Sequence, residues 1–297
     1  MQGLLLLDKP ESVTSYGAVA GVKRISGEKR VGHTGTLDPM ATGVLPVLLG
    51  RATALSSYLL DADKRYTATL RFGVETDTCD ITGTVLTEQK ASVSEQEARD
   101  LLARFTGTGQ QTPPMFSALK RNGVPLYRLA REGKEVEIPE RTITVYENEF
   151  LGLSEDGREL TFSARVSKGT YIRSLCRDMG RFLGVGATMT ALRRTETCGF
   201  SIEECVPLSQ LTSENLSEYL LSPEVAVKSL PAVSVTEKQA TRFCNGGQLA
   251  LERLKNIEAE DGKLYRVRFG EEFLGLGKVD FEREELAVRC VIKESQP

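Results

Sequence analysis

Apolar and polar residues alternate along two segments of the chain in the manner of a strand with one buried face. From residue 65 to 72, every second residue is apolar, and the residues between them are arginine or threonine. Residues 160–166 repeat this period of two, and residues 142–150 are a further candidate strand. Because successive side chains of a strand point to opposite faces of its sheet, these segments predict half-buried strands. The run Leu4–Leu7 predicts a short buried strand.

An apolar spacing of three to four residues predicts helices elsewhere in the chain. The clearest begins at Ser94, where Ser94 and Glu97 form a capping box ahead of an apolar face that ends at Phe105. The predicted helices cover residues 15–25, 51–60, 94–105 and 172–183, and a linker helix is expected to end at Leu221.

Strands mixed with helices in no strict repeat are typical of an α+β domain with a mixed, largely antiparallel sheet. We expect this domain to span residues 1–222. Within it, residues 107–140 show little periodicity and are rich in glycine, proline and basic residues, which is typical of a functional insertion or a disordered loop. Residues 228–297 show short strands and turns, and they predict a second domain with a small β-barrel.

The composition is that of an ordinary globular protein, with 40% hydrophobic and 27% charged residues. The apolar run near the N-terminus is broken at Asp8, too soon for a signal peptide or a membrane span, so a cytoplasmic protein is expected. Six cysteines are scattered without a Cys-x-x-Cys pair, and the chain has 1 histidine. We therefore expect no disulfide framework, no metal site and no cofactor.

The single histidine, His33, limits the chemistry of the chain. A serine or cysteine hydrolase with a histidine base would need His33, and the sequence contains no Gly-x-Ser-x-Gly elbow. Residues 27–34 nearly match a phosphate-binding P-loop, but His33 stands where the lysine must be, and a helix rather than a strand is predicted before it. These observations exclude both classes of enzyme and favour catalysis by a carboxylate.

The carboxylate that fits this role best is Asp38. It lies in the segment 32–46, which is crowded with glycine, threonine and proline. Such residues hold a loop in tight turns and leave backbone amides free to bind polar groups. Because the reference pKa of aspartate is about 3.9, Asp38 is expected to be ionised at pH 7 and can act as a base or a nucleophile.

Charge is distributed unevenly, although the net charge is only -3. Residues 158–194 carry eight basic side chains against two acidic ones, and smaller basic clusters lie at residues 23–30 and 120–134. Proteins that offer one basic face to phosphates show this sorting, so a nucleic acid is the expected partner. The basic and aromatic residues of 107–140 favour an RNA-gripping insertion that becomes ordered on binding.

Across its length, the segment 32–46 resembles the catalytic loop of the bacterial tRNA pseudouridine-55 synthases, which isomerise one uridine in the T loop of tRNA. The resemblance runs from Leu5 to about Thr197. It implies that Asp38 is the nucleophile, that Tyr66 stacks on the target base, and that Tyr171 is the tyrosine of the site. It further implies that Arg173 pairs with Asp38.

The same resemblance implies which residues bind the substrate and which RNA is bound. A histidine at the position of His33 helps to open the T loop in the family, and residues 228–297 are similar to PUA domains. The implied partner is the T arm of tRNA, with the acceptor end as the candidate contact of the C-terminal domain, and the implied enzyme is a monomer. The substrate-binding residues that it assigns are His33, Leu192, Lys9, Pro10 and Lys168.

Two other functions stay open at this level. A pseudouridine synthase for another RNA would share Asp38, and a non-catalytic RNA chaperone would share the basic face and the C-terminal domain. The Lys9-Pro10 motif, the insertion and the C-terminal domain favour tRNA. The sequence does not decide whether Asp38 attacks C1′ of the ribose, attacks C6 of the base, or acts first as a base at the ribose.

Overall fold

Most apolar residues in the larger part of the chain are buried in or against one mixed sheet. The computed structural model describes residues 1–60, 62–134, 136–255 and 257–293. The main path of the sheet has the strand order β14-β1-β3-β12-β4-β11-β10-β7, with β2, β13 and β15 paired beside it. These strands are β1 (Gly3–Lys9), β2 (Val31–His33), β3 (Thr42–Leu49), β4 (Lys64–Phe72), β7 (Gly107–Gln111), β10 (Arg141–Leu153), β11 (Glu159–Val166), β12 (Ala187–Thr197), β13 (Phe200–Ser201), β14 (Val206–Pro207) and β15 (Leu220–Leu221).

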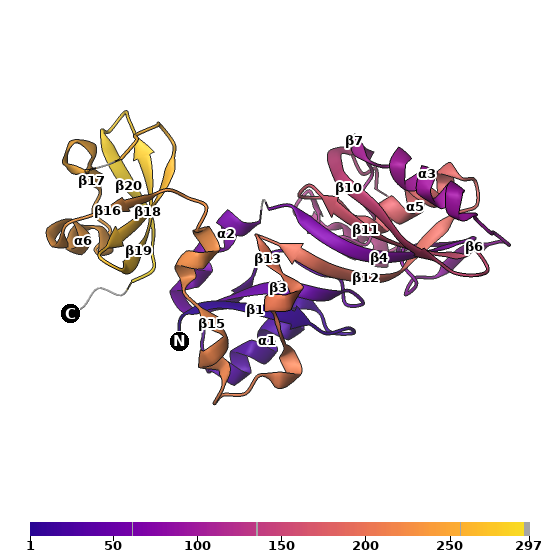
Figure 1. Cartoon of the computed structure of the whole chain (residues 1–297), viewed down its shortest axis with the longest axis horizontal. Helices are drawn as coiled ribbons and strands as arrows, with labels where there is room; N and C mark the ends of the chain where they lie inside the picture. The colour runs from indigo at the N-terminus through magenta and orange to yellow at the C-terminus, as the bar shows by residue number, and fades with distance from the viewer. Residues whose placement is uncertain (61, 135, 256, 294–297) are drawn as a thin grey trace.

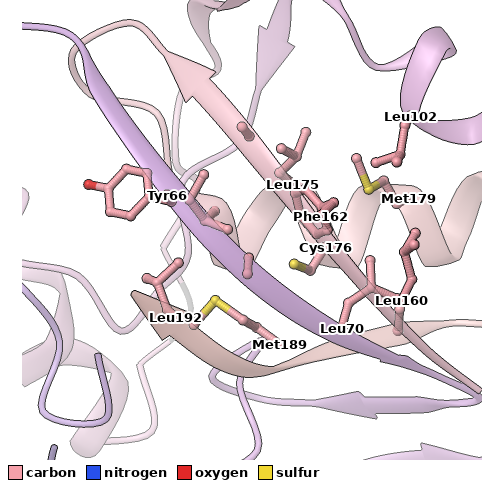
Figure 2. Packing of buried hydrophobic residues seen from close by; sticks show 14 of the residues in the cluster. Tyr66, Leu70, Leu102, Leu160, Phe162, Leu175, Cys176, Met179, Met189 and Leu192 are labelled. Carbon is pink, nitrogen blue, oxygen red and sulfur yellow. The ribbon is translucent and has the colours of Figure 1, made fainter. Parts of the chain in front are cut away.

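Helices bury the apolar faces of this sheet. Side chains of α3 (Glu95–Arg104) and α5 (Ile172–Phe182) pack with those of β4, β10 and β11 in one cluster, part of which is seen in Figure 2. α1 (Ser15–Ser26) packs with β1 and β3 in another cluster. The α+β fold class predicted from the sequence is confirmed. The shorter elements are α2 (Ser56–Leu59), α4 (Leu126–Arg131), η1 (Gly50–Leu55), η2 (Ile202–Glu204), η3 (Leu208–Gln210), η4 (Leu216–Tyr219), η5 (Pro223–Val227), β5 (Val74–Thr76), β6 (Val85–Glu88), β8 (Lys120–Arg121) and β9 (Val124–Pro125).

The large sheet consists of two half-sheets that meet at a short parallel contact between β3 and β12. The pairs in register there are Arg193 with Thr42 and Arg194 with Gly43. Gly43 has a φ of 104°, and a Cβ at this position would lie 2.2 Å from the carbonyl oxygen of Arg194. Glycine is therefore required where the half-sheets meet, because any side chain would force their backbones apart.

Three segments of the larger part of the chain differ from the sequence prediction, and in the C-terminal part the helix α6 (Glu237–Cys244) forms where only short strands and turns are predicted. Residues 51–60 form η1 and one turn of α2 in place of one continuous helix. Residues 107–111, expected in the insertion, form β7 and pair with β10. Its sequence, GTGQQ, has no apolar residue, so backbone pairing makes a strand that periodicity cannot reveal. Residues 208–221 contain η3, η4 and β15 instead of a linker helix, because Leu220 and Leu221 pair with the edge of β1.

The C-terminal part of the chain forms a second sheet with the order β16-β18-β19-β20-β17. Figure 1 shows it as a lobe on the side of the molecule where α2 lies. Leu276 and Ile292 from this lobe share one apolar cluster with Leu55, Leu59 and Ala226, so the two parts pack against each other. Among the described residues, no helix has both the length and the apolar character needed to cross a membrane. The elements of the lobe are β16 (Ala232–Ser234), α6 (Glu237–Cys244), β17 (Leu249–Ala250), η6 (Leu251–Arg253), β18 (Leu264–Phe269), β19 (Glu272–Asp280) and β20 (Glu285–Val291).

Replacing Gly43 by alanine should strongly destabilise the protein. The new Cβ would overlap the Arg194 carbonyl, and the combined strain and overlap should cost at least about 3 kcal/mol of unfolding free energy in urea titrations. Gly27→Ala is the matched control, because Gly27 also has a positive φ, of 64°, but no atom within 4 Å of the place that a Cβ would take. That control should cost about 1–2 kcal/mol. Equal losses in the two variants would contradict the role of the contact.

Candidate active site

The loop between β2 and β3 carries Asp38, and hydrogen bonds fix its course. The Asp38 carbonyl accepts from the Ala41 amide at 3.1 Å, which closes a turn. Ser15, the first residue of α1, binds the backbone of Leu37 twice. Its hydroxyl accepts from the Leu37 amide at 2.8 Å and donates to the Leu37 carbonyl at 2.9 Å. The residue before Asp38 is thereby joined to the first turn of a helix.

A buried arginine, Arg173 in the first turn of α5, lies between two carboxylates. Its Nε is 2.9 Å from Oδ2 of Asp38, and its Nη2 donates to Oδ1 of Asp38 at 3.2 Å. Its Nη1 lies 3.4 Å from Oδ2 of Asp80. The Arg173 guanidinium also donates hydrogen bonds to the carbonyls of Thr78 and Phe116. Only 5% of the Arg173 side chain is exposed, against 34% for Asp38, so the carboxylate is accessible while its partner is fixed from behind.

Opposing effects determine the protonation of Asp38. Burial raises the pKa of its carboxyl above the ordinary value, and the neighbouring Asp80 acts in the same direction. The Arg173 charge opposes this rise, since it stabilises the ionised form. A carboxylate whose pKa is raised is a stronger base than an ordinary aspartate, and the arginine limits the rise.

Lys9 binds the backbone of the loop that carries Asp38. Its side chain is 0% exposed, and its ammonium donates to the carbonyls of Pro10 at 2.7 Å, Val13 at 2.6 Å and Pro39 at 3.2 Å. The ammonium therefore links the residue after Asp38 to the chain that leads into α1. Desolvation by burial lowers the pKa of Lys9 to about 8.

Arg194 joins the two ends of the same loop. Its Nε donates to the Val44 carbonyl at 2.7 Å, and its Nη2 donates to the Gly35 carbonyl at 3.1 Å. The side chain is almost completely buried. Because its backbone also pairs with Gly43, Arg194 fixes the loop at the point where the two half-sheets meet.

The backbone of Tyr171, directly before α5, is held by a side chain from β7. Gln111 accepts from the Tyr171 amide through Oε1 at 2.8 Å and donates to the Tyr171 carbonyl through Nε2 at 3.1 Å. The guanidinium carbon of Arg141 lies 5.9 Å from the centre of the Tyr171 ring. Tyr171 and Arg173 thus have positions that depend on both α5 and the sheet.

Asp38, Asp80, Tyr171, Arg173 and Arg194 are among the residues that line an open cavity of about 910 Å³. Asp38, Tyr171 and Arg173 give it polar groups, and Tyr66 in β4 and Leu192 in β12 give it apolar surface. Figure 2 shows Tyr66 and Leu192 at one end of the core cluster, with the tyrosine hydroxyl directed away from the other labelled side chains. The cavity therefore combines a fixed carboxylate with a surface suited to a planar ring.

His33 also lines the cavity. Burial and the Arg194 charge lower the pKa of its imidazole below the ordinary value, so the ring is neutral at pH 7. Its buried Nδ1 has no hydrogen-bond partner within the part of the chain that the structure describes.

The structure brings most of the predicted site residues to one place. Those that line the cavity are Asp38, Tyr66, Tyr171, Arg173, Leu192 and His33. Lys9 is buried beneath the loop instead, so any effect that it has on a substrate must pass through the loop backbone. Pro10 and Lys168 are exposed and lie outside the cavity lining that the described residues form.

Sequence reasoning missed Ser15, Asp80 and Gln111. Ser15 and Gln111 bind backbone groups of residues far away in sequence, at Leu37 and Tyr171. Such contacts produce neither a periodic pattern nor a motif in the sequence. Asp80 could have been suspected only from the general rule that a buried arginine needs acidic partners, and that rule does not say which acid.

The lowered pKa of Lys9 predicts a specific dependence of stability on pH. Between about pH 8 and 10.5 the folded protein releases the Lys9 proton while the unfolded chain keeps it, so the free energy of unfolding should rise with pH. From pH 8 to 9.5, wild type should gain about 2 kcal/mol relative to Lys9→Met in urea titrations. Lys29→Met, at an exposed lysine, should follow wild type. Parallel curves for wild type and Lys9→Met would contradict the assignment.

Comparison with known proteins identifies the family. Residues 23–172 match the model of the TruB family pseudouridylate synthase (N terminal domain), and residues 173–228 match that of the tRNA pseudouridylate synthase B C-terminal domain. A tRNA pseudouridine synthase B of Clostridium perfringens (strain 13 / Type A) is 44% identical over 293 residues, which is 97% of this chain and 99% of that protein. The protein of the same name from Cronobacter sakazakii is 41% identical over 308 residues, 99% of this chain and 96% of the other.

Solved structures of other proteins are similar to this chain over nearly its whole length. A chain of a Cbf5-Nop10-Gar1 complex superposes with a TM-score of 0.73 at 30% identity, covering 99% of this chain and 85% of that chain. A chain of an H/ACA RNP bound to a substrate RNA containing 2′-deoxyuridine gives 0.72 at 28% identity with the same coverage. Since these similarities extend along nearly the whole chain, the protein belongs to the TruB family and is a tRNA pseudouridine synthase, an isomerase.

Proposed function

We propose that the enzyme converts the uridine at position 55 in the T loop of tRNA into pseudouridine and that Asp38 is its nucleophile. The observation that carries this proposal is the setting of Asp38. It is a partly exposed carboxylate, paired with a buried arginine, in a cavity that also has apolar surface for a base. A non-catalytic chaperone has no need of such an ion pair, and membership of an isomerase family excludes that interpretation as the sole function.

The reaction breaks the bond between C1′ of the ribose and N1 of uracil, turns the base and joins C1′ to C5. C5 then loses its proton, and N1 gains one. Substrate and product are isomers, so the reaction consumes no redox equivalent and no group donor. Asp38 can attack C1′, attack C6 or first remove a ribose proton. Each of these steps requires the ionised carboxylate, which Arg173 stabilises.

The other cavity residues are assigned to holding the base. Tyr66 and Leu192 offer flat and apolar surface against which uracil can turn after the glycosidic bond breaks. The uridine must first leave its stack, which costs a few kcal/mol that contacts with the rest of the loop must offset. His33, which lines the cavity, is proposed to make one such contact.

The RNA is proposed to bind mainly through its T arm. Residues 120–134 carry a cluster of basic side chains, and one of them, Arg131, lines the cavity. Lysines and arginines of this kind neutralise phosphates. Residues 112–140 are the proposed RNA-gripping element. The C-terminal domain, residues 228–297, is proposed to contact the acceptor end of the tRNA. In this proposal the enzyme acts as a monomer, without metal or cofactor.

Asp38→Asn should abolish turnover while it leaves RNA affinity nearly unchanged, because the substitution removes the charge and keeps the size. We expect the single-turnover rate to fall by at least roughly 10³-fold. The measurement is mass spectrometry of a tRNA transcript, with Kd measured in parallel by filter binding. The matched control, Asp100→Asn, changes an exposed aspartate of α3 and should behave as wild type. Near wild-type conversion by Asp38→Asn would refute the nucleophile assignment.

A stem-loop with the T-arm sequence should be converted without metal or nucleotide, and only at the uridine that corresponds to position 55. Its affinity should fall as the salt concentration rises, because bound lysines and arginines release counterions from phosphates. Digestion and mass spectrometry map the modified position, and a stem-loop with the uridine moved by one residue is the control. Conversion restricted to intact tRNA at every RNA concentration, or loss of activity with a chelator, would contradict the proposal.

A further inference from the structure

Tyr16, the second residue of α1, is unusually exposed for an aromatic residue. Its exposed fraction is 80%, the highest among the large apolar side chains that the structure describes. The same tyrosine lines the cavity that contains Asp38. A large ring in water at the entrance of a substrate cavity gains nothing from the protein's own packing, and it offers a free face to a ligand.

The backbone that carries this ring is fixed relative to the loop of Asp38. The neighbouring Ser15 is bonded twice to the backbone of Leu37, which directly precedes Asp38. Thr14 caps the helix by accepting from the Gly17 amide at 2.9 Å. The first turn of α1 and the loop of Asp38 therefore move as one unit, so the backbone of Tyr16 keeps a constant distance from the carboxylate.

We propose that Tyr16 stacks on an unpaired base of the RNA loop beside the flipped uridine and so helps to select and position the substrate. This inference rests on the proposed function. When the target uridine enters the cavity, its former stacking neighbour loses a partner. An exposed tyrosine face can replace that partner, and stacking of a base on an aromatic side chain contributes about 1–3 kcal/mol. In this proposal the buried Tyr66 stacks on the target base, and Tyr16 stacks on the base that stays outside the cavity.

The test combines variants of Tyr16 with RNAs that lack one base. Tyr16→Ala should raise the Kd for a T-arm stem-loop by about 5- to 150-fold, while Tyr16→Phe keeps the ring and should stay within about twofold of wild type. Tyr219→Ala is the control, because Tyr219 is also exposed, at 38%, and lies outside the cavity lining.

Stem-loops with a single abasic nucleotide, placed in turn at each loop position, identify the stacked base. At one position the missing base should weaken binding by wild type and leave binding by Tyr16→Ala unchanged. Wild-type affinity in Tyr16→Ala, or independent effects of the variant and of every missing base, would overturn the inference.

The two proposals can fail separately. Suppose that wild type binds the stem-loop but leaves position 55 unmodified, while one missing base still weakens binding by wild type and not by Tyr16→Ala. The T-loop assignment then fails and the stacking inference stands. If wild type modifies position 55 and Tyr16→Ala does so with unchanged affinity, the stacking inference alone fails. A stem-loop that wild type neither binds nor modifies overturns both.

Discussion

The close approach of two backbones at Gly43 and Arg194 is the constraint on which the rest of the structure depends. It is the place where the half-sheets meet, and it allows no side chain on Gly43. The loop with Asp38 ends directly before this contact, and Leu192 and Arg194 come from the strand on its other side. Asp38 and the apolar surface that Leu192 gives the cavity are therefore placed relative to each other by main-chain geometry.

The second constraint is the balance of positive and negative charges around Asp38. Two carboxylates, Asp38 and Asp80, share Arg173, and Lys9 supplies a further positive charge under the loop. Burying one member of such a group without the others would be costly, since an unpaired charge in a low-dielectric interior is strongly unfavourable. The cluster as a whole carries no net charge when all four groups are ionised. A polyanionic RNA can then approach the exposed edge of Asp38 without being repelled by the site.

The sequence predicted what depends on local pattern or on a contiguous motif. The strands with period two and the capped helix at Ser94 appear as expected, and Asp38, Arg173 and Tyr171 lie together. Prediction failed where structure comes from distant partners. β7 exists because β10 pairs with it, and Gln111 matters because it holds the backbone of Tyr171. Lys9 was assigned to the substrate from its motif alone, although burial places it behind the loop.

Two of the groups that hold the loop, the cations Lys9 and Arg194, bind its main-chain oxygens and not its side chains. Lys9 reaches the carbonyl of Pro39, and Arg194 reaches those of Gly35 and Val44. Every residue type carries the same carbonyl, so residues such as Thr36 and Met40 can diverge during evolution without loosening the anchor. Variation in the loop can thus alter the surface of the cavity while Asp38 stays in place. The anchoring cations have no such freedom, because each binds several carbonyls at once and so joins separate parts of the chain.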